Sequence, residues 1–152
     1  MPGNEVIRGQ PRVVLDTNAV LDWLVFRDPG MRVWSQAIEQ GRLHWVACEA
    51  MRHELQQTLG RAELARWEPD AARVLADLDS HAKVCRAPSS TQAPGLICTD
   101  PDDQVFVDVS LSEGARWLVT HDRALLRLAR AARRSGLEVL KPAAGQVALA
   151  AA

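Results

Sequence analysis

Residues 12–25 of the chain are RVVLDTNAVLDWLV, and this segment indicates the architecture of the whole sequence. Its first four residues, which follow Pro11, form a short apolar run of strand length. The run ends abruptly at Asp16-Thr17-Asn18, three residue types that favour turns and helix N-caps. Residues 19–25 then have the pattern of a first helix. The segment therefore predicts a buried strand that turns sharply into a helix.

The same alternation of strand and helix continues along the chain. We expect further strands at 44–48, 83–86, 117–120 and 137–140, and further helices at 31–40, 49–59, 68–82, 104–111 and 123–135. This order predicts an α/β fold, a single three-layer α/β/α domain whose central sheet is mainly parallel.

Residues 104–111 carry two conflicting signals. Val105, Val107 and Val109 alternate with other residues, which by itself favours a strand. The preceding Asp100-Pro101-Asp102-Asp103 is a strong helix start, because Asp suits the N-cap, Pro the first helical position and further acids the positive helix end. We therefore predict a helix.

The chain has the length and composition of one compact domain. It contains 152 residues, of which 47% are hydrophobic and 24% charged, a balance typical of globular proteins rather than disordered ones. We assign residues 12–142 to the domain, 1–11 to an N-terminal arm and 143–152 to a low-complexity tail that we expect to fray. The Pro- and Ser-rich residues 87–95 are predicted to form a surface loop.

Charge and hydropathy exclude several classes of protein. The formal net charge is -1, so any nucleic-acid contact needs a local basic patch. The sequence has no long apolar stretch and no signal-peptide pattern, so we expect a cytoplasmic protein without a membrane partner. Its three cysteines form no C-x-x-C pair, which indicates neither a disulfide framework nor a structural zinc site.

Acidic side chains follow the predicted strands. Asp16 and Asp122 come after two of them, and Asp100, Asp102 and Asp103 begin a helix. Ligand sites of open parallel sheets lie beyond the carboxyl ends of the strands, so these acids are expected at one edge. Glu54 differs because it borders the apolar stripe of a helix, where a charge needs a partner. That partner could be an arginine or a metal ion.

Clustered carboxylates repel one another unless a cation neutralises them. Mg²⁺ and Mn²⁺ prefer oxygen ligands, and such an ion can lower the pKa of a water and orient it against a phosphodiester. Taken singly, however, each aspartate also fits a turn or capping role, and Glu54 also fits a surface ion pair.

Four motifs together resemble the PIN-domain nucleases, and in particular the VapC-like ribonucleases of bacterial toxin–antitoxin systems. They are VVLDTNAVLDWL at 13–24, RHEL at 52–55, TDPDDQVF at 99–106 and WLVTHDRALL at 117–126. The resemblance extends from Val13 to Pro142. It implies a parallel sheet between helices, an acidic metal site at its carboxyl edge, and cleavage of RNA with Mg²⁺ or Mn²⁺.

The resemblance also implies roles for individual residues. Asp16 and Asp103 would be direct metal ligands, with Asp100 as the substitute for Asp103. Glu54 and Asp122 would be further ligands or would hold water on the ion.

Two polar neighbours would orient these carboxylates by hydrogen bonds. They are Asn18, matching the Asn that braces the first Asp, and Thr120, matching the Thr of the T-x-D motif. His121 departs from the pattern, because relatives often have a small residue there.

Contacts to substrate and partners are less clearly marked. Arg123, Arg127, Arg130 and Arg134 form one stripe of a predicted helix. The first two lie near the expected site and are candidate phosphate contacts, whereas the last two are more typical of a solvated face. The resemblance further implies a homodimer and a small antitoxin partner. Trp34 and Trp117 are expected in the core, and burial is also favoured for Trp23 and Trp67 over an interface or base-stacking role.

Two other functions remain open from the sequence. A catalytically weak PIN-like RNA-binding or regulatory protein would bind RNA without needing Asp16. A phosphatase or phospho-acceptor domain is disfavoured, because Asp16-Thr17-Asn18 lacks the second aspartate of a D-x-D motif.

Overall fold

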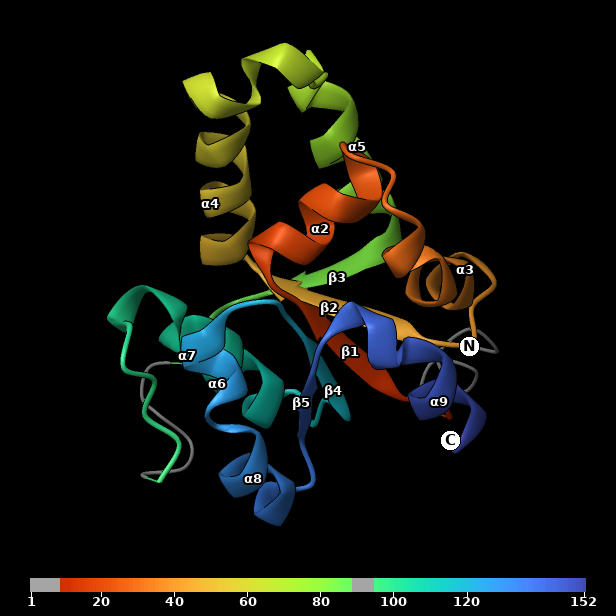
Figure 1. The fold of residues 1–152 in the computed structure, drawn as a ribbon, viewed down its shortest axis with the longest axis vertical. Helices are drawn as coiled ribbons and strands as arrows, with labels where there is room; N and C mark the ends of the chain where they lie inside the picture. Colours follow the sequence, from red (N-terminus) through yellow and green to blue (C-terminus); the bar gives the residue numbers. More distant parts are fainter. Residues whose placement is uncertain (1–8, 89–94) are drawn as a thin grey trace.

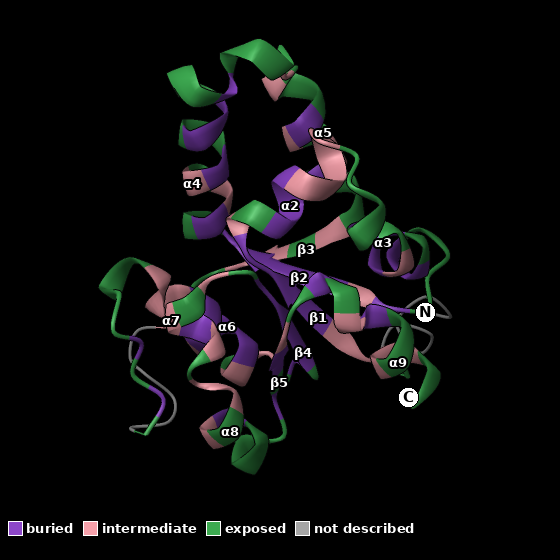
Figure 2. Cartoon of the chain, in the orientation of Figure 1, coloured by how far each residue is buried: buried purple, intermediate pink, exposed green. Residues whose placement is uncertain are grey.

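The computed structural model describes residues 9–88 and 95–152, and within them five parallel strands form the centre of the molecule (Figure 1). The strands are β1 (Arg12–Leu15), β2 (His44–Cys48), β3 (Ala82–Cys85), β4 (Trp117–Val119) and β5 (Glu138–Leu140), in the spatial order β3-β2-β1-β4-β5. Figure 2 shows the middle of the sheet buried between helices, which explains why its strands are continuous apolar runs.

Helices cover both faces of the sheet. They are α2 (Thr17–Leu24), α3 (Arg32–Glu39), α4 (Glu49–Leu59), α5 (Ala71–His81), α6 (Gln104–Ser112), α7 (Arg123–Leu126), α8 (Ala129–Ala132) and α9 (Gly145–Ala150). Short 3₁₀ helices connect them: η1 (Pro29–Met31), η2 (Ala62–Trp67), η3 (Pro101–Asp103), η4 (Arg133–Ser135) and η5 (Pro142–Ala144). Among the described residues, none of these helices is long and apolar enough to cross a membrane.

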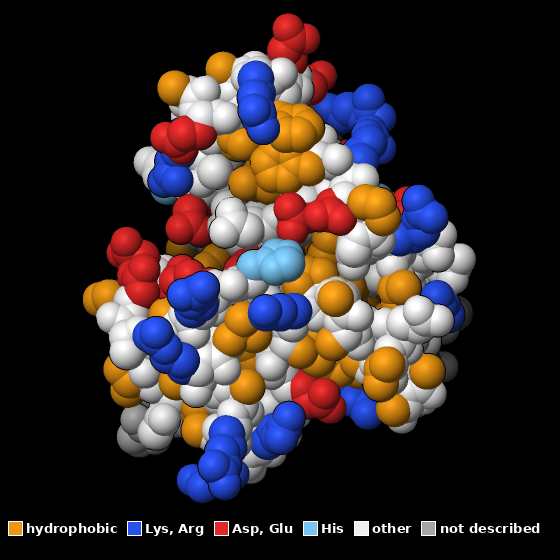
Figure 3. All heavy atoms as spheres, viewed as in Figure 1, with side chains coloured by type: hydrophobic (Ala, Val, Ile, Leu, Met, Phe, Trp, Pro, Cys, Tyr) orange, Lys and Arg blue, Asp and Glu red, His pale blue; other side chains and the backbone are white. Residues whose placement is uncertain are grey.

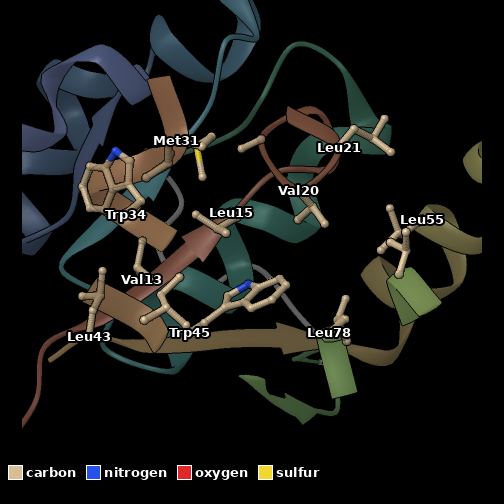
Figure 4. Packing of buried hydrophobic residues seen from close by; sticks show 14 of the residues in the cluster. Val13, Leu15, Val20, Leu21, Met31, Trp34, Leu43, Trp45, Leu55 and Leu78 are labelled. Atoms are coloured by element: carbon tan, nitrogen blue, oxygen red, sulfur yellow. The ribbon is translucent and has the colours of Figure 1, made fainter. Parts of the chain in front are cut away.

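Successive residues of β1 point into two separate cores. Val13 and Leu15 pack with residues of α2 to α5, including Trp34, Leu55 and Leu78 (Figure 4). Val14 faces the opposite way and packs with residues of α6, α7 and α8. This alternation is the period of a β-strand, and it confirms the predicted three-layer arrangement.

The helix predicted at 104–111 is present as α6. The side chain of Asp100 accepts a hydrogen bond from the backbone N–H of Asp102 at 3.0 Å, and Pro101 is the first residue of η3. Phe106, Val107 and Val109 of α6 are buried. The valines therefore alternate in the sequence although they belong to a buried helix and not to a strand.

The helix predicted at 123–135 is not continuous. It divides into α7, α8 and η4, and at the break the backbone N–H of Leu128 donates to the carbonyl of Leu125 at 3.0 Å. A bond over three residues tightens the turn and interrupts the regular α-helical ladder. The arginine stripe therefore does not lie on a single helix.

The tail at 143–152, expected to fray, forms most of η5 and α9. Its first helical turn packs on Trp34, whose indole Nε1 donates to the carbonyl of Pro142 at 3.0 Å. Gly145 lies so close that a Cβ there would be 2.5 Å from the same nitrogen. A contact between residues far apart in sequence thus orders the tail.

The tryptophans follow the prediction in part. Trp34 and Trp117 are buried, with ring centroids 5.7 Å apart. Trp23 is half-buried and packs on Trp45 at 5.3 Å. Burial was the wrong expectation for Trp67, which is 45% exposed beside Phe26 because it lies at the end of η2, at the surface. Residues 1–8 of the predicted arm and 89–94 of the predicted loop lie outside the described residues.

Candidate functional site

The two central strands β1 and β4 bring distant residues together at the carboxyl edge of the sheet. Leu15 pairs with Val119, so the next residues, Asp16 and Thr120, lie side by side. The backbone N–H of Asp16 continues the pairing by donating to the carbonyl of Val119 at 3.1 Å. The strand order changes direction here, because β2 lies on one side of β1 and β4 on the other, and open α/β sheets bind ligands at such a point.

Asp16 is only 4% exposed and is fixed by hydrogen bonds to both carboxylate oxygens. Its Oδ1 accepts from the backbone N–H of Ala19 at 2.8 Å, which makes it the N-cap of α2, and its Oδ2 accepts from the hydroxyl of Thr120. Burial raises the pKa of Asp16, and these two hydrogen bonds partly offset that rise. Each oxygen keeps a second lone pair, so the capping role leaves the carboxylate able to bind a ligand.

Thr120 also positions Asp122. The hydroxyl oxygen of Thr120 accepts from the backbone N–H of Asp122 at 2.8 Å. The Oδ1 of Asp122 accepts from the backbone N–H groups of Ala124 at 2.7 Å and Leu125 at 3.3 Å, so Asp122 is the N-cap of α7. One hydroxyl thus joins the two aspartates that follow β1 and β4.

Asp103 directly precedes α6 as its N-cap residue and, unlike Asp100 and Asp102, lines the site. It is half-buried, and its side chain makes no capping hydrogen bond. Asp100 caps η3 instead, and Asp100 and Asp102 are exposed. Burial raises the pKa of Asp103 to about 7, together with a hydrogen bond to Asp122 and the negative charges of Asp122, Asp100 and Glu54. The carboxyl of Asp103 therefore keeps its proton up to near neutral pH.

Glu54 is held by a hydroxyl and not by the arginine that its sequence pattern allows. Its carboxylate accepts a hydrogen bond from the hydroxyl of Thr17, in the first turn of α2. Within residues 9–88 and 95–152 it forms no ion pair with an arginine. Packing of α2 beside α4 supplies this hydroxyl, which the sequence spacing does not indicate.

These side chains line one cavity of about 150 Å³ at the carboxyl edge of the sheet. Figure 3 shows acidic side chains gathered in the region between α4 and α7, with basic ones above and below. The residues lining the cavity are Asp16, Thr17, Asn18, Glu54, Thr58, Arg61, Asp103, Phe106 and Asp122. All four carboxylates expected at the site are thus in one place, whereas the substitute, Asp100, is outside it.

A family model described as PIN domain matches residues 12–124. The chain belongs to the PIN-domain family. Members of this family are generally nucleases and typically use divalent metal ions. Among solved structures, the crystal structure of PAE2754 from Pyrobaculum aerophilum is similar, with a TM-score of 0.57 and 20% sequence identity over 93% of this chain and 97% of that one. This likeness supports the fold alone. No curated protein matches the chain.

The structure also places the remaining residues that the sequence singled out. Asn18 lines the cavity, but in the described part of the chain it makes no hydrogen bond to Asp16, which is held by Ala19 and Thr120 instead. Arg123 and Arg127 are exposed and do not line the cavity. His121 does not line it either; its Nε2 lies 3.3 Å from the carboxylate of Asp22.

The structure also adds residues to the site of this PIN domain that motif analysis missed. Thr17, Thr58, Arg61 and Phe106 all line the cavity. For two of them a signal exists in the sequence, because Glu54, Thr58 and Arg61 are spaced by four and three residues and so share one helical face. Phe106 and Thr17 carry no comparable signal.

The donor set of this PIN domain fits a hard divalent cation. In residues 9–88 and 95–152, no three histidine, cysteine or acidic side chains converge as a ready-made metal cluster. Mg²⁺ does not need one, because it keeps several waters and is commonly held by one or two carboxylates. Asp16 and Asp103 meet this requirement, since both line the cavity, and Asp103, whose pKa is raised, would give up its proton to a cation.

Proposed function

We propose that this protein is a divalent-metal-dependent nuclease that hydrolyses RNA phosphodiester bonds with Mg²⁺ or Mn²⁺. The observation that carries the proposal is the gathering of four carboxylates from four separate segments around one cavity at the carboxyl edge of the sheet. Such a concentration of negative charge is unfavourable without a cation, as the raised pKa of Asp103 indicates. The RNA substrate is taken from the resemblance of the four sequence motifs.

In this proposal each side chain has a defined task. Asp16 and Asp103 would bind the ion, and Glu54 and Asp122 would bind it or hold water on it. Thr120 keeps Asp16 and Asp122 in fixed orientations, and Thr17 does the same for Glu54. The bound ion would lower the pKa of a water and stabilise charge on the leaving oxygen. The water oxygen would form a new bond to phosphorus as the bond from phosphorus to the leaving oxygen breaks; the water would lose one proton, and the leaving oxygen would gain one.

Cleavage assays on purified protein test the proposal. Single-stranded RNA, double-stranded RNA and single-stranded DNA of the same sequence are incubated with Mg²⁺, Mn²⁺ or EDTA. The matched control is Asp16→Asn, because asparagine can still cap α2 while losing the charge. RNA cleavage that requires metal and is lost in Asp16→Asn supports the proposal. Equal behaviour of the two proteins contradicts it, and RNA binding without hydrolysis is then the alternative.

The biological setting stays a prediction of the resemblance. It comprises a toxin role, a small antitoxin partner and a homodimer. Growth of cells that express the wild-type protein or Asp16→Asn tests the toxin role. A toxin that acts by catalysis slows growth as the wild-type protein and stops doing so when Asp16 is replaced.

A further inference from the structure

Arg61 enters the acidic cavity from the end of α4. Its backbone N–H donates to the carbonyl of Thr58 at 3.1 Å and its own backbone is extended, so Arg61 follows directly after the helical end of α4. Thr58 and Arg61 come four and seven residues after Glu54, and all three line the same cavity. Three residues of one stripe thus present, in order, a carboxylate, a hydroxyl and a guanidinium.

The charge of Arg61 has no partner within the described residues. Arg61 is the one basic residue that lines the cavity, alongside four carboxylates, yet it forms no ion pair and no side-chain hydrogen bond there. Arg52 of α4 behaves differently, because it makes two hydrogen bonds of 2.8 Å to Asp79. A guanidinium that served to neutralise the acids would be paired with one of them. Arg61 is exposed, with its donors available to a ligand.

We propose that Arg61 binds a phosphate of the RNA strand at the mouth of the cavity, an inference that rests on the proposed nuclease function. A polyanion approaching four carboxylates is repelled unless a fixed positive charge meets it. The net charge of -1 provides no general attraction, so a single local cation has a large effect. The planar guanidinium suits this task because it can donate two parallel hydrogen bonds to phosphate oxygens.

Binding of a single-stranded RNA oligonucleotide tests the inference directly. Fluorescence anisotropy is measured with Mg²⁺ at several salt concentrations, in an Asp16→Asn background so that the RNA is not cut. The variants are Arg61→Ala and Arg61→Lys. The control is Arg42→Ala, which removes the same charge at the opposite edge of the sheet, just before β2. Thermal unfolding of each protein reports on the fold, and Mn²⁺ titration of the same Arg61 and Arg42 variants with Asp16 restored reports on the metal site.

We expect Arg61→Ala to weaken RNA binding roughly tenfold, the effect of losing one charged hydrogen-bonded contact. The slope of log K against log salt should become shallower by about 0.7, the value for one phosphate contact on a single strand. Arg61→Lys should lose less RNA affinity than Arg61→Ala, and Arg42→Ala should lose none. Mn²⁺ binding by Arg61→Ala should be unchanged or tighter, because a positive charge has left the cavity.

Two results overturn the inference. In the first, Arg61→Ala binds RNA as tightly as Arg42→Ala does. In the second, Arg61→Ala loses RNA binding but also loses Mn²⁺ binding or the fold to the same extent. Failure of the proposed function looks different, since the wild-type protein would then bind RNA through Arg61 without metal-dependent cleavage. Wild-type cleavage that Arg61→Ala retains in full overturns the role of Arg61 and leaves the nuclease function standing. A protein that binds no RNA overturns both.

Discussion

Replacing Asp103 by asparagine should stabilise the metal-free protein above neutral pH. Asp103 is half-buried, hydrogen-bonded to Asp122 and close to the charges of Asp100 and Glu54, which together raise its pKa from 3.8 to about 7. Its folded-state pKa lies above the unfolded one, so the protonated carboxyl favours the fold at low pH. This contribution is complete below the unfolded pKa of 3.8, and it is lost as the pH rises from there to about 7. Asparagine stays neutral and can donate to Asp122 at any pH.

The size of the effect follows from the pKa. A rise from 3.8 to about 7 corresponds to roughly 4 kcal/mol if the whole shift acts on folding. Solvent screens a half-buried carboxylate, so we expect about 1–2 kcal/mol of added unfolding free energy for Asp103→Asn at pH 8. For a chain of this size, that is an increase in Tm of about 5 °C. At pH 5 the folded carboxyl is protonated but the unfolded one is already largely ionised, so the gain should fall to less than half of its value at pH 8 and vanish only below 3.8.

Thermal and urea unfolding in EDTA at pH 5 and pH 8 measure this difference. Asp102→Asn is the matched control, because Asp102 is a neighbouring exposed aspartate that does not line the cavity. It should change stability by only a few tenths of a kcal/mol at both pH values. Adding Mn²⁺ should stabilise the wild-type protein and reverse the order at pH 8, because Asp103→Asn has lost a proposed ligand.

Two results would refute the electrostatic reasoning. One is a gain for Asp103→Asn that is equal at pH 5 and pH 8, which would show that its cause is not ionisation of the carboxyl. The other is a loss of stability at pH 8, which would mean that the ionised carboxylate is favourably accommodated in the metal-free fold.

Two further predictions concern packing and hydrogen bonding. Thr120→Val keeps the shape but removes the hydroxyl that donates to Asp16 and accepts from Asp122, so the unfolding free energy at pH 8 should fall by about 1–3 kcal/mol. Thr120→Ser keeps a hydroxyl and should retain most of this free energy. Equal urea midpoints for the wild-type protein and Thr120→Val would contradict this prediction. Gly145→Ala places a Cβ 2.5 Å from Trp34 Nε1 and should cost about 1–3 kcal/mol in urea unfolding, while Gly60→Ala, where the nearest atom is 3.6 Å away, should be nearly neutral. A Gly145→Ala protein as stable as Gly60→Ala would show that α9 does not pack on Trp34.

Local sequence patterns were sufficient for the elements that carry the site. β1, β2 and α4 have the ends predicted for them, because each combines an apolar run or stripe with clear turn or capping residues. The capping signal at Asp100-Pro101 correctly outweighed the strand-like alternation of α6. The same signals placed acidic residues at strand ends and helix starts, where a parallel sheet brings them to one edge.

The sequence by itself thus determined the α/β architecture and gathered the candidate acids, because strand ends, caps and helical stripes are local properties of the chain. The tertiary structure alone decided which neighbours those acids have. The register of β1 and β4 gives Asp16 its bond from Thr120, and the packing of α2 beside α4 gives Glu54 its bond from Thr17. The tertiary structure also orders the tail against Trp34 and leaves Trp67 at the surface. These contacts join residues distant in sequence, so they depend on how whole elements pack, which no local pattern encodes.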